Sequence, residues 1–307
     1  MSLIELIERS SARLTQAGVC FGQGTLNAFD EAAWLVLWRL GLPLDALDAH
    51  AEQAVAEPDL QAVETLIGLR ISSRQPAAYL TGEAWLQGVP FTVDARVIIP
   101  RSLIAEPLAE GDIDPWLSDR SRRALDLCTG NGSLAVLAAM AWHELLVDAS
   151  DLSADALAEA RLKDDRHGLQ ARIALHQGDG LAAVAGQRYD LILCNPPYVN
   201  QASMAALPAE FQAEPPLALD GNAAGGDDGM DFIRGLLRDA PAQLCPEGVL
   251  VLEIGHERPF FEAAFPQLDP VWLATSAGDD QVLLLTREAL LAGASPPPAP
   301  APLKPSP

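Results

Sequence analysis

Apolar residues recur at helical spacing through the first 80 or so positions of the chain. One such group occupies residues 34–40 and another occupies residues 63–71. Positions three and four apart share one face of an α-helix, so each group would bury an apolar stripe. Gly41 and Pro43 interrupt the pattern between them. The spacing predicts a domain of four or five helices over residues 1–85.

A short stretch of β-prone sequence follows the helical region. Residues 89–93 and 96–99 are predicted to form two strands around a turn at Asp94-Ala95. We expect this hairpin to lie in a linker, residues 86–110, which joins the helical domain to the rest of the chain.

From Ala124 onward, short apolar runs alternate with helical stretches. Strands are predicted at 124–128, 145–149, 171–176, 189–194, 249–254 and 282–286, and helices at 133–142, 154–163, 230–244 and 259–265. Such alternation is typical of a mostly parallel sheet covered by helices on both faces. A segment at 271–275 is close enough to pair with 282–286 as a hairpin, which would make one strand antiparallel. The pattern predicts an α/β domain over residues 111–292.

The composition indicates a folded chain with an acidic surface. Hydrophobic residues make up 49% of the chain, whereas residues 293–307 are rich in proline and alanine and are expected to be disordered. The net charge is −22, which disfavours contact with nucleic-acid phosphates. An acidic surface would attract a basic partner, although solubility alone is an equally good reason for the charge.

The cysteines and the N-terminus bear on the setting of the protein. Cys20, Cys128, Cys194 and Cys245 have neither paired nor metal-type spacing, so we expect a reduced, cytoplasmic setting and no metal ion. The first residues resemble an amphipathic helix with interspersed charges rather than a signal peptide. The longest apolar run, residues 134–142, is far shorter than the ~20 residues that span a bilayer, so no membrane contact is expected.

A glycine turn marks a candidate ligand site. The first strand of the α/β domain runs into a turn formed by Asp126, Leu127, Cys128, Thr129, Gly130, Asn131 and Gly132. A helix follows directly, with Ser133 as its candidate N-cap. Glycines between a strand and a helix let the backbone approach a bound ligand. Alone the turn is weak support for a nucleotide-type ligand, because any tight strand-to-helix turn favours the same residues.

Three further features favour one class of cofactor. Asp151 ends the second strand about 20 residues later, where α/β nucleotide folds bind ribose hydroxyls. Asp179 follows the third strand and would meet an adenine amine. The third glycine of the dinucleotide fingerprint is missing, which disfavours a pyrophosphate and hence NAD. Since Asp126 suits a cofactor with a positively charged amino-acid end, the set predicts S-adenosylmethionine.

The sequence Asn195-Pro196-Pro197-Tyr198 follows the fourth strand. Ligands of open α/β sheets bind beyond the carboxyl ends of the strands, so this loop should face the cofactor. The prolines fix the backbone, and the Pro196 carbonyl and the Asn195 side-chain oxygen could accept both hydrogens of a planar amide or amino group. This would aim the nitrogen at a methyl carbon without a strong base, while Tyr198 packs against the flat amide. A Pro-Pro turn capped by asparagine is the purely structural alternative.

The tetrapeptide and the turn at 126–132 together resemble the bacterial N(5)-glutamine methyltransferase family, whose members modify release factors or a large-subunit ribosomal protein. The flanking sequence resembles the branch that acts on the third protein of the large subunit. The segments that show this resemblance are 22–25, 27–32, 99–102, 104–106, 207–211, 214–215, Trp272 and 278–282. The similarity covers nearly all of the chain from about Leu3 to Leu291.

The resemblance implies a helical domain that recognises the protein substrate, and a Rossmann-like, seven-stranded S-adenosylmethionine methyltransferase domain whose last strand is antiparallel. The cofactor contacts that it implies are Asp126, Cys128, Thr129, Gly130, Asn131, Gly132, Asp151, Asp179 and Asn195. The implied substrate contacts are Asn195, Pro196, Pro197 and Tyr198, to which we add Arg101, and we expect Asn195, Pro196 and Tyr198 to be catalytic. Gly180 departs from the bulky residue that often follows the adenine-side aspartate, and residues 220–224 resemble a small insertion.

Three other functions stay open at this point. The first is methylation of a release-factor glutamine by the same chemistry. The second is methylation of an extruded DNA adenine, which the acidic charge and the lack of a basic, aromatic-rich region disfavour. The third is a non-enzymatic role in which an acidic surface chaperones a basic ribosomal protein. Glu253, in the strand at 249–254, is expected to be structural rather than catalytic.

Overall fold

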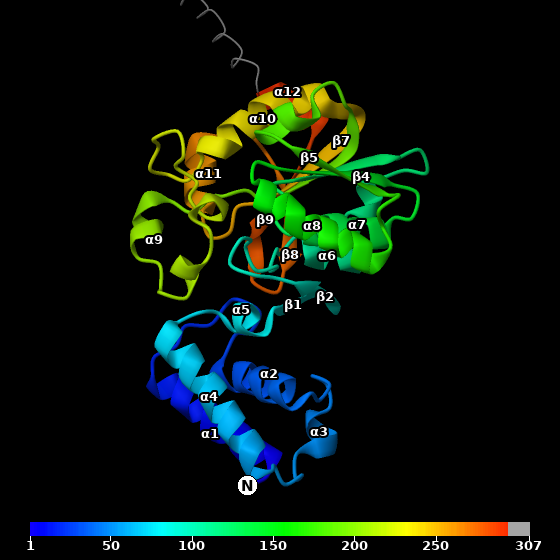
Figure 1. The fold of residues 1–307 in the computed structure, drawn as a ribbon. Coiled ribbons are helices and arrows are strands. Elements are labelled where there is room, and N and C mark those ends of the chain that lie inside the picture. The colour runs from blue at the N-terminus through cyan, green and yellow to red at the C-terminus, as the bar shows by residue number, and fades with distance from the viewer. Residues whose placement is uncertain (294–307) are drawn as a thin grey trace, which may run out of the picture.

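The structure, a computed structural model, describes residues 1–293, apart from the side chains of residues 162–166. The predicted tail at 293–307 lies outside the described residues from position 294 onward. A small helical region and a larger α/β region lie one above the other, with a two-stranded sheet between them (Figure 1).

Five helices form the N-terminal region, in agreement with the four or five expected. They are α1 (Leu3–Gln16), α2 (Ala28–Leu40), α3 (Leu47–His50), α4 (Glu57–Ser73) and α5 (Ala77–Thr81). A capping box between Ser2 and Glu5 begins α1, and the side chain of Asn27 caps α2. Gly41 ends α2 in the left-handed conformation, with φ 67°. The apolar faces of these helices share one core.

The linker hairpin differs from the expected one. Its strands are β1 (Glu83–Leu86) and β2 (Val89–Thr92), which pair antiparallel. The predicted turn at Asp94-Ala95 and the predicted strand at 96–99 are wrong. Gln87 and Gly88 have φ values of 50° and 73°, as a two-residue hairpin turn requires. The first predicted strand, residues 89–93, therefore forms the second strand of the hairpin, and its partner is β1. The Asp94 side chain accepts a hydrogen bond from the backbone of Arg96, which folds residues 94–96 into a local turn.

A seven-stranded sheet forms the α/β region, with the strand order β5-β4-β3-β6-β7-β9-β8. The strands are β3 (Arg123–Leu127), β4 (Leu146–Asp151), β5 (Ile173–Gln177), β6 (Tyr189–Cys194), β7 (Leu244–Glu253), β8 (Val271–Thr275) and β9 (Gly278–Thr286). The pairs among β3 to β7 are parallel, and β9 runs antiparallel to both of its neighbours. The predicted α/β fold with an antiparallel last strand is therefore confirmed.

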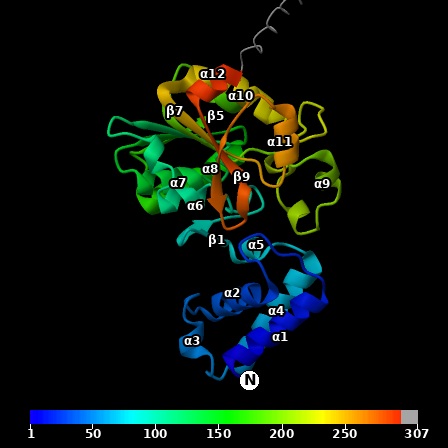
Figure 2. The same ribbon diagram turned by 180° about the vertical axis from the view of Figure 1, so that it is seen from behind.

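Helices cover both faces of this sheet. One face packs against α7 (Ser133–Ala141), α8 (Ala154–His167) and α6 (Ala105–Glu110), and the other against α10 (Asp231–Gln243), α11 (Arg258–Ala264) and α12 (Arg287–Gly293) (Figures 1 and 2). Alternate residues of each central strand contribute to the two cores, as expected for strands buried on both faces. The carboxyl ends of β3, β4, β5 and β6 thus lie along one edge of the sheet.

Shorter elements complete the chain and border that edge. They are α9 (Gln201–Ala205) and the 3-10 turns η1 (Asp114–Trp116), η2 (Gly180–Val184), η3 (Phe211–Ala213) and η4 (Pro216–Ala218). The turn between β8 and β9 reaches back to α6, where Ser276 donates its backbone N–H to the Glu106 carboxylate at 2.5 Å. Within residues 1–293, every helix is too short or too polar to cross a bilayer.

Candidate active site

The glycine turn after β3 takes a tight left-handed path. Cys128, Gly130 and Gly132 have φ values of 60°, 55° and 81°. A methyl group on Gly132 would lie 3.0 Å from the Ala160 Cβ, so the turn packs directly against α8. Cys128 adopts a conformation that is uncommon for residues other than glycine, and such strain is concentrated at functional sites.

The predicted N-cap of the following helix is wrong. Ser133 is the first helical residue, and Gly132, which has no side chain, holds the N-cap position. The Asn131 side-chain oxygen instead accepts the backbone N–H of Ser133 at 3.2 Å. Because Gly132 has a left-handed φ, the chain enters the helix one residue earlier than the sequence pattern indicated.

Asp126 is a buried carboxylate at the start of this turn. Its Oδ2 accepts hydrogen bonds from the Thr129 hydroxyl at 2.5 Å and from the Ala135 backbone N–H at 2.9 Å. Its Oδ1 is buried and has no partner among the described residues. Burial raises the pKa of Asp126 to about 7, although the two hydrogen bonds favour the charged form. The free oxygen therefore suits a cationic hydrogen-bond donor.

Asp151 and Asp179 end the next two strands along the same edge. Asp151 accepts the backbone N–H groups of Gly130 and Ser153, each at 2.8 Å, and burial raises its pKa. One of its oxygens therefore also orders the glycine turn. Asp179 is exposed and borders the cavity beside Phe232 of α10. A methyl group on Gly180 would lie 3.6 Å from the Phe232 ring.

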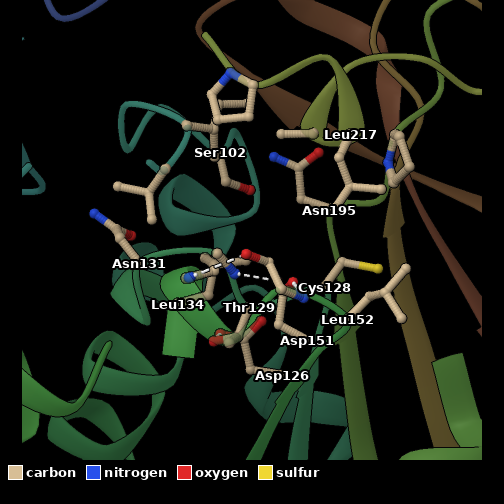
Figure 3. A pocket seen from close by; sticks show the side chains of 18 of the residues that line it. Ser102, Asp126, Cys128, Thr129, Asn131, Leu134, Asp151, Leu152, Asn195 and Leu217 are labelled. Carbon is tan, nitrogen blue, oxygen red and sulfur yellow. Dashed lines mark hydrogen bonds between the residues drawn. The ribbon is translucent and has the colours of Figure 1, made fainter. Parts of the chain in front are cut away.

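One cavity brings most of the predicted residues together. Its wall includes Arg101, Asp126, Cys128, Thr129, Gly130, Asn131, Asp151, Asp179, Asn195 and Pro197. Three predicted residues do not line it, namely Gly132, Pro196 and Tyr198. Figure 3 shows the Asn195 amide on the same side as Ser102 and Leu217, with Asp126, Thr129 and Asp151 across the cavity. The cavity thus has a face formed by the glycine turn and a face formed by the Asn195 loop.

Asn195 reaches this cavity because β6 is the direct neighbour of β3. The register pairs Leu127 with Cys194, so the glycine turn and the Asn195 loop leave the sheet side by side. Asn195 and Pro197 are partly exposed to the cavity, whereas Pro196 is buried. Within the tetrapeptide, the asparagine side chain is therefore the polar group that the cavity presents.

Tyr198 points to a buried carboxylate behind this loop. Its hydroxyl donates to Glu253 Oε1 at 3.1 Å, and Glu253 Oε2 accepts from the Ser102 hydroxyl at 2.6 Å and from the Leu103 N–H at 2.9 Å. Burial raises the pKa of Glu253. A methyl group on Gly255 would lie 2.6 Å from the Tyr198 ring, so the ring rests against the backbone there. Glu253 thereby joins the Asn195 loop to the turn that holds Arg101.

Arg101 is fixed by Glu214 and Phe211, for which the sequence predicted no role at the site. Glu214 accepts from both of its terminal nitrogens, at 2.6 and 2.7 Å, and also from the Ile99 N–H at 3.0 Å. The guanidinium group lies 5.5 Å from the ring centre of Phe211. Both residues lie in segments that carry the family resemblance, 207–211 and 214–215, and this resemblance is the signal that could have marked them.

Possible metal-binding groups can be described only for the residues whose side chains the structure describes. Among them, no group of three or more histidine, cysteine, aspartate or glutamate residues is arranged to hold a metal ion.

Comparisons with known proteins identify relatives of this chain. Residues 113–222 match the model of the methyltransferase small domain. The ribosomal protein uL3 glutamine methyltransferase of Bordetella pertussis is 54% identical over 94% of this chain and 96% of its own length, and that of Burkholderia pseudomallei is 49% identical over 92% and 93%. A solved methyltransferase from Pyrococcus furiosus is similar at 17% identity over 66% of this chain and 90% of its own, with a TM-score of 0.47. The relatives cover nearly the whole chain at high identity, and the chain therefore belongs to the ribosomal protein uL3 glutamine methyltransferase family.

Proposed function

We propose that this protein transfers a methyl group from S-adenosylmethionine to the side-chain amide nitrogen of a glutamine in ribosomal protein uL3. The observation that supports this most directly is the pairing of β3 with β6. This pairing sets the Asp126 turn and the Asn195 amide on facing walls of one cavity. The names of the relatives supply the substrate, because they act on a glutamine of uL3.

S-adenosylmethionine is the cofactor, and the residues present fit it. The free Oδ1 of Asp126 would accept the cationic amino group of its methionine end. Asp151 would accept from the ribose hydroxyls, and Asp179 from the adenine amine. The left-handed turn at Cys128 to Gly132 leaves room for the chain of the cofactor between them. The bound cofactor supplies an electrophilic methyl group on a sulfonium that is already a good leaving group.

The chain's own contribution is to orient a weak nucleophile. The lone pair of an amide nitrogen is delocalised into its carbonyl, so the nitrogen attacks only when it is held and polarised. The Asn195 side-chain oxygen and the Pro196 carbonyl would accept the two amide hydrogens and fix the nitrogen in line with the methyl group. The two acceptors would also stabilise the positive charge that develops on the nitrogen as the sulfonium–methyl bond breaks, and one of the two amide hydrogens then leaves as a proton to water. Tyr198 would act by holding the loop through Glu253, and Arg101 would line the substrate side.

The substrate protein would be recognised outside this cavity. We assign substrate recognition to the helical region, residues 1–85, the linker role to residues 86–110 and catalysis to residues 111–292. The net charge of −22 favours a basic ribosomal protein over direct contact with nucleic acid or membrane lipid. This assignment places the reaction in the cytoplasm, where ribosomal proteins are made.

An Asn195→Ala variant tests the proposal. The variant should lose methyl transfer to uL3 by at least about a hundredfold in kcat, because one acceptor that fixes the amide is gone. The variant should still bind the cofactor measurably. Radiolabelled methyl transfer to uL3 from a strain that lacks this protein gives the rate, and calorimetry gives the cofactor affinity. Full activity of Asn195→Ala would disprove the role of the amide.

The choice of substrate needs a separate readout. Mass spectrometry of uL3 and of the release factors from the same deletion strain should show that only uL3 has lost a methyl group. A methyl group missing from the release factors alone, or labelled transfer to DNA rather than protein, would overturn the assignment. Cells in which Asn195→Ala restores growth or ribosome assembly without restoring methylation would indicate a chaperone role instead.

A further inference from the structure

A long loop leaves the Asn195 loop and returns to its side. The Val199 N–H donates to the Leu219 carbonyl at 2.9 Å, and the Gly221 N–H donates to the Val199 carbonyl at 3.1 Å. The two ends of residues 199–221, which we call the cover segment, therefore meet directly beside Tyr198. The part of the segment that lines the cavity comprises Pro215, Leu217, Ala218, Asp220 and Gly221. The cover segment forms one wall of the substrate side.

The far end of the cover segment is attached to the helical region through Glu210. The Glu210 side chain is 3% exposed, and its Oε1 accepts from the Cys20 N–H at 3.1 Å and from Arg74 at 3.2 Å. Arg70 lies 3.5 Å away and is itself 1% exposed. The backbone carbonyl of Glu210 accepts from the Gln23 side chain at 3.3 Å. Each of these four partners belongs to the first 85 residues.

Between Glu210 and the cavity, the cover segment also holds Arg101. The Phe211 ring lies over the Arg101 guanidinium and would be 3.3 Å from a methyl group on Gly22. Four residues after Glu210, the fully buried Glu214 binds Arg101 through two hydrogen bonds. A continuous set of contacts thus runs from the helical region through Glu210, Phe211 and Glu214 to the cavity wall.

We propose that Glu210 is a positioning residue for the methyl transfer. By tying the cover segment to the helical region, Glu210 sets the place of Arg101 and Leu217 relative to Asn195. A buried carboxylate with basic partners adds little net stability, because desolvation offsets most of the attraction, but it fixes geometry. The helical region would therefore shape the acceptor side of the cavity in addition to recognising the substrate protein.

The inference rests on the proposed function. Kinetic measurements distinguish a positioning role of Glu210 from a role in stability alone. A misplacement of about 1 Å at an acceptor site can cost up to a hundredfold in rate. The partners of Glu210 do not include Asp126 or a residue of the glycine turn, so its replacement should leave the affinity for the cofactor unchanged. A residue needed only for folding would lower the amount of active protein, but not the rate per molecule that binds cofactor.

The experiment compares Glu210→Gln with Glu247→Gln in the full chain. Glutamine keeps the size of the side chain and removes its charge. Glu247 also pairs with an arginine distant in sequence, Arg120, but both side chains are largely exposed and neither lines the cavity. We measure kcat and KM for uL3, normalised to cofactor-binding sites from calorimetry, and amide hydrogen exchange over residues 199–221.

For Glu210→Gln we expect kcat to fall about tenfold with KM for uL3 within about twofold and unchanged cofactor affinity. Amide exchange in the cover segment should speed up by about tenfold or more. Glu247→Gln should match the wild type in all four measurements. A wild-type kcat for Glu210→Gln, or a rise in KM alone, would overturn the inference.

A second variant covers the case in which Glu210→Gln does not fold. The Phe211 side chain is only partly buried, and Phe211→Leu introduces no charge. The substitution removes the contact of the ring with Arg101. It should lower kcat in the same direction, and a wild-type kcat there would also overturn the inference. If the wild-type protein itself fails to methylate uL3, the proposed function is wrong. If amide exchange in the cover segment is unchanged in the variants, Glu210 does not anchor this segment to the helical region.

Discussion

At the scale of single residues, Asp126 combines burial with an incomplete set of partners. One oxygen receives two hydrogen bonds and the other receives none among the described residues. Burial raises its pKa to about 7 from an ordinary value of 3.8, so near neutral pH the cofactor-free protein holds a fraction of a proton there. A cationic amino group beside the free oxygen would favour the charged form and expel that proton.

This linkage predicts the pH dependence of cofactor binding. Affinity should rise as the pH increases through about 7 and then level off, because binding releases one proton only while Asp126 is protonated. In the cofactor-free protein the sign is opposite: the raised pKa favours the folded state below pH 3.8, and this contribution is lost as the pH rises through about 7. Calorimetry in buffers of different ionisation enthalpy measures the protons released. Asp126→Asn should release none, and equal release by both proteins would contradict the assignment.

The site residues that follow the strands could be predicted from the sequence, but the long-range contacts of the loop residues could not. Asp126, Asp151 and Asn195 each follow a strand directly, and the rule that ligands bind beyond strand ends places them at one site. Glu210 and Glu214 act on residues more than a hundred positions away. No local pattern encodes such contacts, because they depend on how the loop folds back on the linker. The sequence predicts that the Tyr198 ring packs against the substrate amide, but it gives no sign that the hydroxyl binds Glu253.

At the scale of elements, the end of β7 shapes the Asn195 loop through a glycine. Gly255 follows β7 with φ 53°, and its Cα approaches the Tyr198 ring so closely that no side chain fits. Because Tyr198 also bonds to Glu253 at the end of the same strand, the loop is held at two adjacent points. The position of the tetrapeptide therefore depends on β7 as much as on β6.

A Gly255→Ala variant should displace the Tyr198 ring and lower kcat by about tenfold or more. Gly168→Ala is the matched control, since Gly168 has a similar φ of 69°, is exposed, and has open space around its Cα. Both variants bear the strain of a left-handed alanine, about 1 kcal/mol in unfolding free energy. Thermal unfolding measures that strain, and methyl-transfer assays measure the rate. Equal kcat values for the two variants would show that crowding of Tyr198 has no role.

Elements with a strong apolar pattern were predicted well, and the exceptions have physical causes. The buried strands β3, β4 and β6 are short and mostly apolar, and α-helices follow β3 and β4 as parallel crossovers require. The sequence contains two possible hairpin turns, Gln87-Gly88 and Asp94-Ala95. The hairpin was predicted around the second turn, whereas it forms around the first. Residues 96–99 are β-prone, but the Ile99 N–H bonds to Glu214 rather than to a partner strand. A tertiary contact thus outweighed the local propensity.

At the scale of the whole molecule, the charge should govern how the protein meets its substrate. A net charge of −22 produces a field that draws a basic protein towards it and is screened within about 8 Å at physiological salt. Salt screens the charge of Asp126 in the cavity less, because this residue is buried. Substrate encounter and cofactor binding should therefore respond differently to salt.

Raising the salt concentration from about 0.05 M to about 0.3 M should increase KM for uL3 several-fold, with kcat nearly constant. Cofactor affinity measured in the same series should change by less than about twofold. Steady-state assays and calorimetry at each salt concentration provide the comparison. A KM that is independent of salt would mean that the acidic surface only keeps the protein in solution.

The position of β9 also governs how the chain can fold while it is being synthesised. The strand β7 pairs on one side with β6 and on the other with β9, which is made more than twenty residues later and is needed before β8 can join the sheet. The helical region relies on neighbours close in sequence and can form early. A nascent chain on the ribosome would therefore present an assembled helical region and an open apolar edge at β7, which chaperones would have to shield until residues 278–286 emerge.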